Sequence, residues 1–327
     1  MRVEIWADVV CPWAYIGKRR LEKALAGWDG EPVEVVWRPY RIDPAAPAPG
    51  EPLADLLRDP RVDEALRSCN PDLTPADNRS LVERIAATEG LGPPWGAAWR
   101  VSTHDAHRLI ALAYEHGGAG LQDAVAEGVL RAHFVEALDL SRPEVLGGVA
   151  ARAGFAEGAD LLAAGAGDEQ VRESLLVGKA MGVRTSPTLV VAGRALAGAQ
   201  PPEVIREFLE EAGATVPRRL PAEVERLRHA ESLLDQRDPL GSLALLRPLL
   251  GEHGDDRGVR MLAARAYYAS AQLGRAAATL ERLVAESPDD SYARHLLGRT
   301  LQRQGRPEQA GPHLAMASAM TPSYDVT

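Results

Sequence analysis

The sequence predicts an α/β domain followed by an all-α domain of helical repeats. Three observations support this fold class: a strand-like run that stops at a cysteine where a helix begins, a second strand followed by a long, mostly helical stretch, and a 34-residue period towards the C-terminus. The chain of 327 residues is long enough for two domains that each bury a core.

The composition fits a soluble globular protein, with 46% apolar and 25% charged residues. A net charge of −9 argues against nucleic acid or an anionic membrane as the main partner. The N-terminus does not resemble a signal peptide, and no apolar run approaches the ~18 residues of a membrane span. Two cysteines in a chain of this length fit a reducing compartment, so the expected location is cytoplasmic.

The first two dozen residues contain the candidate nucleophile. A run of apolar and β-favouring residues, Val3 to Val10, predicts a buried strand. It stops at Cys11, and Pro12 suits the first turn of a helix. Unpaired backbone N–H groups and the helix dipole favour thiolate over thiol at this position, so Cys11 suits nucleophilic chemistry. The other interpretation is that Cys11 is a small buried apolar residue.

A resemblance favours the first interpretation. The stretch Cys11-Pro12-Trp13-Ala14-Tyr15-Ile16-Gly17-Lys18 resembles the active site of the DsbA family of thioredoxin-fold oxidoreductases, in its FrnE-like branch. That branch normally has CPWC where this chain has CPWA. A C-x-x-C enzyme uses its second thiol to release substrate from a mixed disulfide, and Ala14 has no thiol. Cys11 therefore needs a thiol from elsewhere to complete a cycle.

Two further stretches resemble the same family in the same order. Trp37-Arg38-Pro39-Tyr40 lies in the second predicted strand and is close to the family's W-R-P-F. A helical insertion follows at about residues 45–177, where Ser102 to Leu109 is similar to the family's N-T-x-D-A-H-R-L. Ser102 is the expected helix N-cap. The resemblance allows His107 to lie near the thiol, as a substrate-binding residue or as a buried polar residue. His104 is one turn away but has no third ligand nearby, so no metal site is expected.

The segment Gly182 to Val191 resembles the thioredoxin-fold loop whose cis proline faces the cysteine. We expect a cis bond before Pro187, the alternative being an ordinary trans proline at the start of a strand. Thr185, Ser186 and Pro187 are the expected substrate-binding residues. Ser186 departs from the family's valine at a position that normally helps to set thiol reactivity. A hairpin and a last helix then complete a thioredoxin-like domain at residues 1–212.

Beyond a linker at residues 213–221, the segment 222–327 has a period of 34 residues. Its aligned positions are Ala230, Ala264 and Gly298, then Leu233, Tyr267 and Leu301, then Ser242, Ala276 and Ala310, then Leu246, Leu280 and Leu314. These resemble the core positions of the tetratricopeptide repeat, which implies three helical hairpins stacked on a shared core. Such arrays usually bind peptides or proteins, so the expected partner is a protein or peptide client. The other expected role of the repeat domain is to form a homodimer.

The leading functional hypothesis is a thiol–disulfide oxidoreductase of the DsbA/FrnE-like type that acts through one thiol. Cys11 is the expected nucleophile, flanked by Trp13. No tightly bound cofactor is expected. The mixed disulfide is resolved by a low-molecular-weight thiol such as glutathione, by a substrate thiol or by Cys69, for which an inert role is the alternative.

Two other hypotheses remain open. The fold and its insertion also resemble 2-hydroxychromene-2-carboxylate isomerases and kappa-class glutathione transferases, which use one thiol or hydroxyl at this helix start together with bound glutathione. The remaining hypothesis is a non-catalytic scaffold or accessory protein, because the motif lacks its second thiol and the chain carries a protein-binding array.

Overall fold

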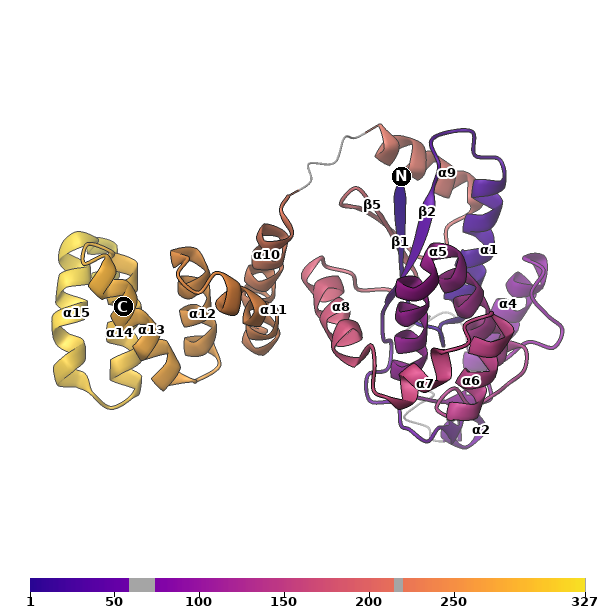
Figure 1. Ribbon diagram of the computed structural model, residues 1–327, viewed down its shortest axis with the longest axis horizontal. Helices are drawn as coiled ribbons and strands as arrows, with labels where there is room; N and C mark the ends of the chain where they lie inside the picture. Colours follow the sequence, from indigo (N-terminus) through magenta and orange to yellow (C-terminus); the bar gives the residue numbers. More distant parts are fainter. Residues whose placement is uncertain (59–73, 215–219, 327) are drawn as a thin grey trace. The chain divides into compact units, whose positions relative to one another are not determined.

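The computed structural model describes residues 1–58, 74–214 and 220–326, which form two compact units (Figure 1). The first unit consists of Met1–Gly178 and Val183–Arg218, and the second of Lys179–Gly182 and Arg219–Thr327. The first is a thioredoxin-like α/β domain with a helical insertion, and the second is built of helical repeats, as predicted. Within the described ranges, no helix is both long and apolar enough to cross a membrane.

A four-stranded sheet forms the centre of the first unit. Its strands are β1 (Arg2–Ala7), β2 (Glu34–Pro39), β5 (Thr188–Val191) and β6 (Arg194–Ala197), in the order β2-β1-β5-β6. β1 pairs in parallel with β2 and antiparallel with β5, and β5 pairs antiparallel with β6. α1 (Pro12–Ala26) connects β1 to β2 and packs against α9 (Pro202–Gly213). The strand–helix–strand start predicted from the sequence is therefore confirmed.

The insertion between β2 and β5 is mostly helical. Its elements are β3 (Glu51–Pro52), α2 (Leu53–Leu56), α4 (Pro75–Thr88), β4 (Trp99–Arg100), α5 (His104–Phe134), α6 (Pro143–Arg152), α7 (Gly158–Ala163) and α8 (Asp168–Ala180). The antiparallel pair β3–β4 was not predicted. The span of α5 joins two helices across a kink at Gly118, whose backbone is not helical (φ 67°, ψ −163°). Its N-cap is Thr103, without a side-chain capping bond, so the assignment of Ser102 was wrong.

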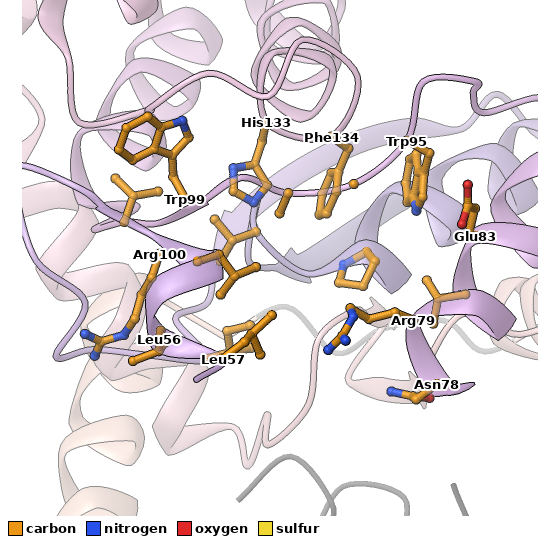
Figure 2. A pocket seen from close by; sticks show the side chains of 18 of the residues that line it. Leu56, Leu57, Asn78, Arg79, Glu83, Trp95, Trp99, Arg100, His133 and Phe134 are labelled. Atoms are coloured by element: carbon orange, nitrogen blue, oxygen red, sulfur yellow. The ribbon is translucent and has the colours of Figure 1, made fainter. Parts of the chain in front are cut away.

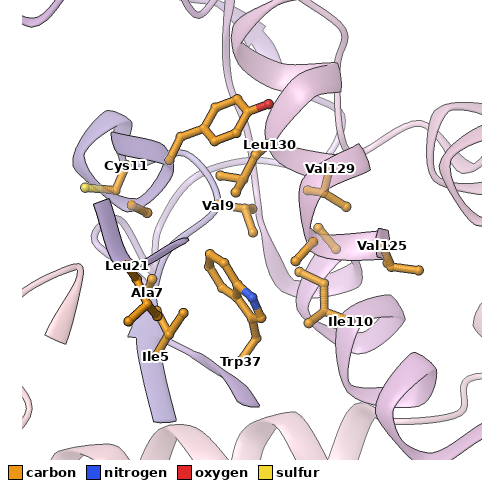
Figure 3. Packing of buried hydrophobic residues seen from close by; sticks show 14 of the residues in the cluster. Ile5, Ala7, Val9, Cys11, Leu21, Trp37, Ile110, Val125, Val129 and Leu130 are labelled. Carbon is orange, nitrogen blue, oxygen red and sulfur yellow. The ribbon is translucent and has the colours of Figure 1, made fainter. Parts of the chain in front are cut away.

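The core of the first unit lies between the sheet and α5. Figure 3 shows Ile5 and Trp37 on the sheet facing Val125 and Val129 of α5. Trp37 is 3% exposed, and its backbone N–H and C=O bond to the amide side chain of Gln122, at 2.8 and 3.1 Å. β2 is an edge strand, so these two backbone groups of Trp37 have no neighbouring strand to bond to. The Gln122 side chain satisfies their hydrogen bonds instead.

The second unit contains three helical hairpins. Its helices are α10 (Ala222–Asp235), α11 (Pro239–Glu252), α12 (Arg257–Ala269), α13 (Leu273–Glu286), α14 (Ser291–Arg303) and α15 (Pro307–Met320), followed by the short 3₁₀ helix η1 (Pro322–Val326). The small periodic residues are buried, including Ala230, Ala264 and Ala276, and so are Leu246 and Leu280. The positions that recur every 34 residues in the sequence therefore form the buried core of the hairpins.

Candidate active site

Cys11 occupies the N-cap of α1, in extended backbone conformation (φ −86°, ψ 116°). β1 ends at Ala7, and the turn that follows is closed by a bond from the Cys11 N–H to the Asp8 carbonyl (3.0 Å). The first turn of the helix begins with a bond from the Ala14 N–H to the Cys11 carbonyl (2.9 Å). The strand end and the proline that starts the helix therefore fix the cysteine at the helix N-terminus, as predicted.

The loop before β5 lies against this turn. The Ser186–Pro187 bond is cis, as predicted. The Cys11 thiol donates to the Ser186 carbonyl (3.3 Å), and the Ser186 hydroxyl accepts from the Asp8 N–H (2.9 Å). α1 also approaches the loop closely: a Cβ at Gly17 would lie 3.0 Å from Cγ of Pro187. The structure therefore brings together residues that are 175 positions apart in the chain.

The thiol of Cys11 is buried, with 6% of the residue exposed. Burial raises the pKa of the Cys11 thiol, and the charge of Asp8 adds to this effect. A hydrogen bond with the Ser186 side chain and those with the backbone N–H groups of Ala14 and Trp13 act in the opposite direction and lower this pKa. Burial outweighs the effect of the helix start, so the direction of the shift is opposite to the one expected from the helix N-terminus alone.

A buried carboxylate, Asp8, lies beneath the thiol. Asp8 is 1% exposed; its Oδ2 accepts from the Ile42 N–H (2.7 Å), and its Oδ1 lies 3.4 Å from Nε2 of His107. The same nitrogen lies 2.9 Å from the Tyr40 carbonyl, which only accepts, so Nε2 carries the hydrogen. His107 is 4% exposed, so its side chain lies buried between Asp8 and the Tyr40 carbonyl.

Asp8 was missed by the sequence analysis. Its signal was an acidic residue inside an apolar run, three positions before the cysteine. A carboxylate is costly to bury unless hydrogen bonds satisfy it, so an acidic residue in a run expected to be buried indicates a partner elsewhere in the fold. The partner, His107, was itself singled out from the sequence, but nothing local linked the two residues.

The other residues singled out from the sequence lie in different surroundings. Ala14 is fully buried, and Trp13 packs partly buried against the core. Cys69 lies outside the described residues. Thr185 is exposed, and its carbonyl accepts from the Thr188 hydroxyl (2.8 Å). Among the described residues, no group of three or more His, Cys, Asp or Glu is arranged to hold a metal ion, and His104 bonds to Asp168 (2.7 Å).

The fold and the site together define a class of protein: a thioredoxin-fold domain with a cysteine at the start of its first helix and a cis-proline loop against that cysteine. The chain matches the family model of the DSBA-like thioredoxin domain over residues 2–210. It belongs to this family. Residues 233–299 match the tetratricopeptide repeat.

Known proteins resemble mainly the first unit. A probable DsbA oxidoreductase from Streptomyces coelicolor is 30% identical, over 68% of this chain and 94% of that one, with a TM-score of 0.56. The cytosolic disulfide reductase DsbM from Pseudomonas aeruginosa, in a structure with GSH, is 19% identical over 66% of this chain and 100% of that one, with a TM-score of 0.43.

A curated relative matches over a shorter stretch. The uncharacterized protein YwbO from Bacillus subtilis (strain 168) is 33% identical over 60 residues, which are 18% of this chain. The match spans about a quarter (26%) of that relative's length.

Proposed function

We propose that this protein is a thiol–disulfide oxidoreductase that acts through a single active-site thiol, Cys11. The observation that carries the proposal is the position of the Cys11 sulfur at the N-terminus of α1, 3.3 Å from the Ser186 carbonyl beside a cis proline. An extended substrate segment would lie along Thr185, Ser186 and Pro187, where its disulfide meets the thiol.

The chemistry is a two-step thiol–disulfide exchange. The Cys11 thiolate attacks one sulfur of a substrate disulfide, forms a mixed disulfide, and the other substrate sulfur leaves as a thiolate. A second thiolate then attacks the substrate-side sulfur of the mixed disulfide, forms a new disulfide with it and releases the Cys11 thiolate. Because Ala14 replaces the usual second cysteine, the resolving thiolate is external: a low-molecular-weight thiol such as glutathione, or a thiol of the substrate.

The repeat domain supports this activity by binding a protein or peptide client. Stacked helical hairpins present extended surfaces that suit peptide segments. We place the reaction in a reducing compartment, the cytoplasm, because a thiol pool is needed for the second step.

The test is formation of a mixed disulfide with glutathione disulfide in the Cys69→Ser variant, followed by mass spectrometry across pH. We expect one glutathione at Cys11, a rate that rises with pH as the thiolate forms, and release by reduced glutathione. Cys11→Ser is the matched control and should remain unmodified at this site. Exchange at Cys11 slower than in the denatured chain would count against the proposal.

A second candidate function, a non-catalytic accessory protein, is favoured by the burial of Cys11 and the raised pKa of its thiol. The same experiment separates the two functions. A folded protein whose Cys11 resists both glutathione disulfide and alkylation would leave the repeat domain as the functional half.

A further inference from the structure

The two units differ in the surface that they offer to a partner. In the first unit, a cavity of about 1260 Å³ beside the Cys11 turn has aromatic side chains such as Trp95 and Phe134 in its wall, and it adjoins the candidate active site (Figure 2). In the second unit, the first helices of the three hairpins, α10, α12 and α14, carry more charged residues than the second helices (Figure 1). Charge is therefore what the repeat unit offers to a partner.

Side-chain contacts join α10, α12 and α14 into one surface. Arg265 of α12 pairs with Glu231 and Asp235 of α10, at 3.3 and 3.5 Å. Arg303 of α14 donates to the Tyr268 carbonyl of α12 (2.9 Å), and its guanidinium lies over the Tyr268 ring, 4.5 Å from the centroid. On each helix the contacting residues lie three or four positions apart and so share a face. We call this surface the charged face; it consists of Glu231, Asp235, Arg265, Tyr268, Arg299 and Arg303.

α14 forms a basic end of the charged face. The helix contains Arg294, Arg299 and Arg303 and no acidic residue. Within the described ranges, no ion pair joins any of these three arginines to a carboxylate. Arg299 and Arg303 are exposed and four positions apart, so their side chains are neighbours. Burial and the charge of Arg299 lower the pKa of His295, because a further positive charge is unfavourable there.

α10 forms an acidic end. The side chains of Glu231 and Asp235 are 54% and 66% exposed, and that of Arg265, which pairs with both, is 31% exposed. Two carboxylates around one guanidinium leave a net negative charge at this end. Packed helices lie about 8–10 Å apart, so the two ends, separated by α12, are roughly 20 Å from each other. An extended chain covers this distance in about six residues.

We propose that the charged face binds an extended segment of a protein client that carries carboxylates at one end and basic residues at the other. The carboxylates pair with Arg299 and Arg303, whose planar guanidinium groups can each hold both oxygens of a carboxylate. The basic residues pair with Glu231 and Asp235. The inference rests on the client binding proposed for the repeat domain, and the thiol chemistry of Cys11 plays no part in it.

Other partners fit this distribution of charge less well. Nucleic acid carries a negative charge at every phosphate, so α10 would repel it. A uniformly acidic segment would meet the same repulsion from Glu231 and Asp235. An apolar segment would cover Arg299 and Arg303 without supplying partners for them, and burying an unpaired charge is costly.

The test compares two peptides of the same composition by isothermal titration calorimetry against the full chain at pH 7 and low salt. In acetyl-EGEAFAGKGK-amide the two kinds of charge are separated, and in acetyl-EGKAFAGEGK-amide they are mixed. We expect the separated peptide to bind roughly fivefold more tightly, since the mixed peptide loses about two exposed ion pairs. Added salt should reduce this preference. Equal affinities, or no saturable binding of either peptide, would overturn the proposal.

Arg299→Gln tests the basic end, and its matched control is Arg282→Gln, which removes an exposed arginine from α13, the second helix of its hairpin. We expect the preference to fall to roughly twofold in Arg299→Gln, the loss of about one ion pair, and to persist in Arg282→Gln. Arg303→Gln is the second variant if Arg299→Gln folds poorly. A preference that persists in both folded variants of α14 would overturn the role of these arginines. Displacement of the separated peptide by an equal concentration of a short deoxythymidine oligomer would identify nucleic acid as the partner and overturn the proposal.

The same preparations keep this inference separate from the thiol chemistry. Neither peptide contains a thiol or a disulfide, so Cys11→Ser should bind both as the unaltered chain does. Mixed-disulfide formation with glutathione disulfide tests Cys11 independently. A peptide preference in a chain whose Cys11 does not exchange would support the charged face and count against the oxidoreductase, and exchange without a preference would do the reverse.

Discussion

The pKa of the Cys11 thiol is raised by some of its neighbours and lowered by others. The effect of the Asp8 charge can be measured separately by mutation. Burial and the Asp8 charge raise the thiol pKa, while the helix start lowers it. A negative charge nearby disfavours the thiolate, so Asp8→Asn should lower the pKa of Cys11 and speed its alkylation at neutral pH. The asparagine oxygen can still accept the Ile42 N–H, so the turn is retained. The pH dependence of alkylation in a Cys69→Ser background measures the shift.

Glu4→Gln is the matched control for Asp8→Asn. Glu4 lies on β1, the strand that precedes the Asp8 turn, and pairs with Arg38 (2.7 Å), so Glu4→Gln should leave the Cys11 pKa unchanged. An unchanged or higher thiol pKa in Asp8→Asn would show that Asp8 acts on the fold and not on the charge balance at the sulfur.

His133 couples the stability of the first unit to pH. Its folded-state pKa is about 4, against an ordinary 6.5, so the unfolded chain binds a proton between these values that the folded chain excludes. The free energy of unfolding should therefore fall by about 3 kcal/mol as pH drops from 6.5 to 4. Above pH 6.5 His133 is neutral in both the folded and the unfolded chain, so it causes no loss of stability there.

The contribution of His133 can be isolated with His133→Phe, whose loss of stability over the same pH window should be smaller by about that amount. Urea unfolding followed by tryptophan fluorescence is selective, because all six tryptophans precede residue 100. Parallel curves for the two proteins between pH 6.5 and 4 would contradict a neutral, buried imidazole.

At this scale the sequence predicted Cys11 and Pro187 but not the environment of the thiol. The cysteine and the proline are marked by local signals, a strand end and a turn, so neighbouring residues suffice. The direction of the Cys11 pKa shift, the contact of Asp8 with His107 and the burial of His133 depend on segments far apart in the chain.

Among the elements, the helical repeats offer a test of close packing. A Cβ at Gly298 of α14 would lie 2.6 Å from Cγ of Leu314 on α15. Alanine favours a helix more than glycine by up to about 1 kcal/mol, but overpacking costs typically about 1–3 kcal/mol. We expect Gly298→Ala to lower the free energy of unfolding of the second unit by about 1 kcal/mol or more.

Gly274→Ala provides the matched control, because nothing lies within 4 Å of a Cβ at this exposed position of α13. It should leave stability unchanged or raise it by a few tenths of a kcal/mol. Far-UV circular dichroism follows the helices of both units, and tryptophan fluorescence follows the first unit alone, so a transition seen only by circular dichroism reports the repeat unit. Equal effects of the two substitutions would mean that α14 and α15 do not approach closely at Gly298.

Elements with strong periodicity or turn chemistry were predicted well. The hairpin between β5 and β6 turns at Ala192 and Gly193, both with positive φ (50° and 80°), as a two-residue turn requires. The glycine run in α5 separates two helices at Gly118, whose positive φ of 67° suits glycine. The two-residue strands β3 and β4 are too short to leave a pattern.

For the whole molecule, the sequence reveals two units because their signals differ in kind. The first is marked by family motifs and strand patterns, and the second by a repeat period. All the contacts described at Cys11 come from the first unit: the Asp8 turn, the start of α1 and the Ser186–Pro187 loop. The environment of the Cys11 thiol is therefore built by the first unit.

This division predicts that a fragment of residues 1–214 keeps the site. Its Cys11 should show the same alkylation pKa as the full chain in a Cys69→Ser background, within about 0.3 units, since no charge that acts on the sulfur has been removed. Its tryptophan unfolding transition should remain cooperative. A clearly shifted pKa in a folded fragment would mean that the repeat unit contributes to the environment of the thiol, and that client binding and thiol reactivity are coupled.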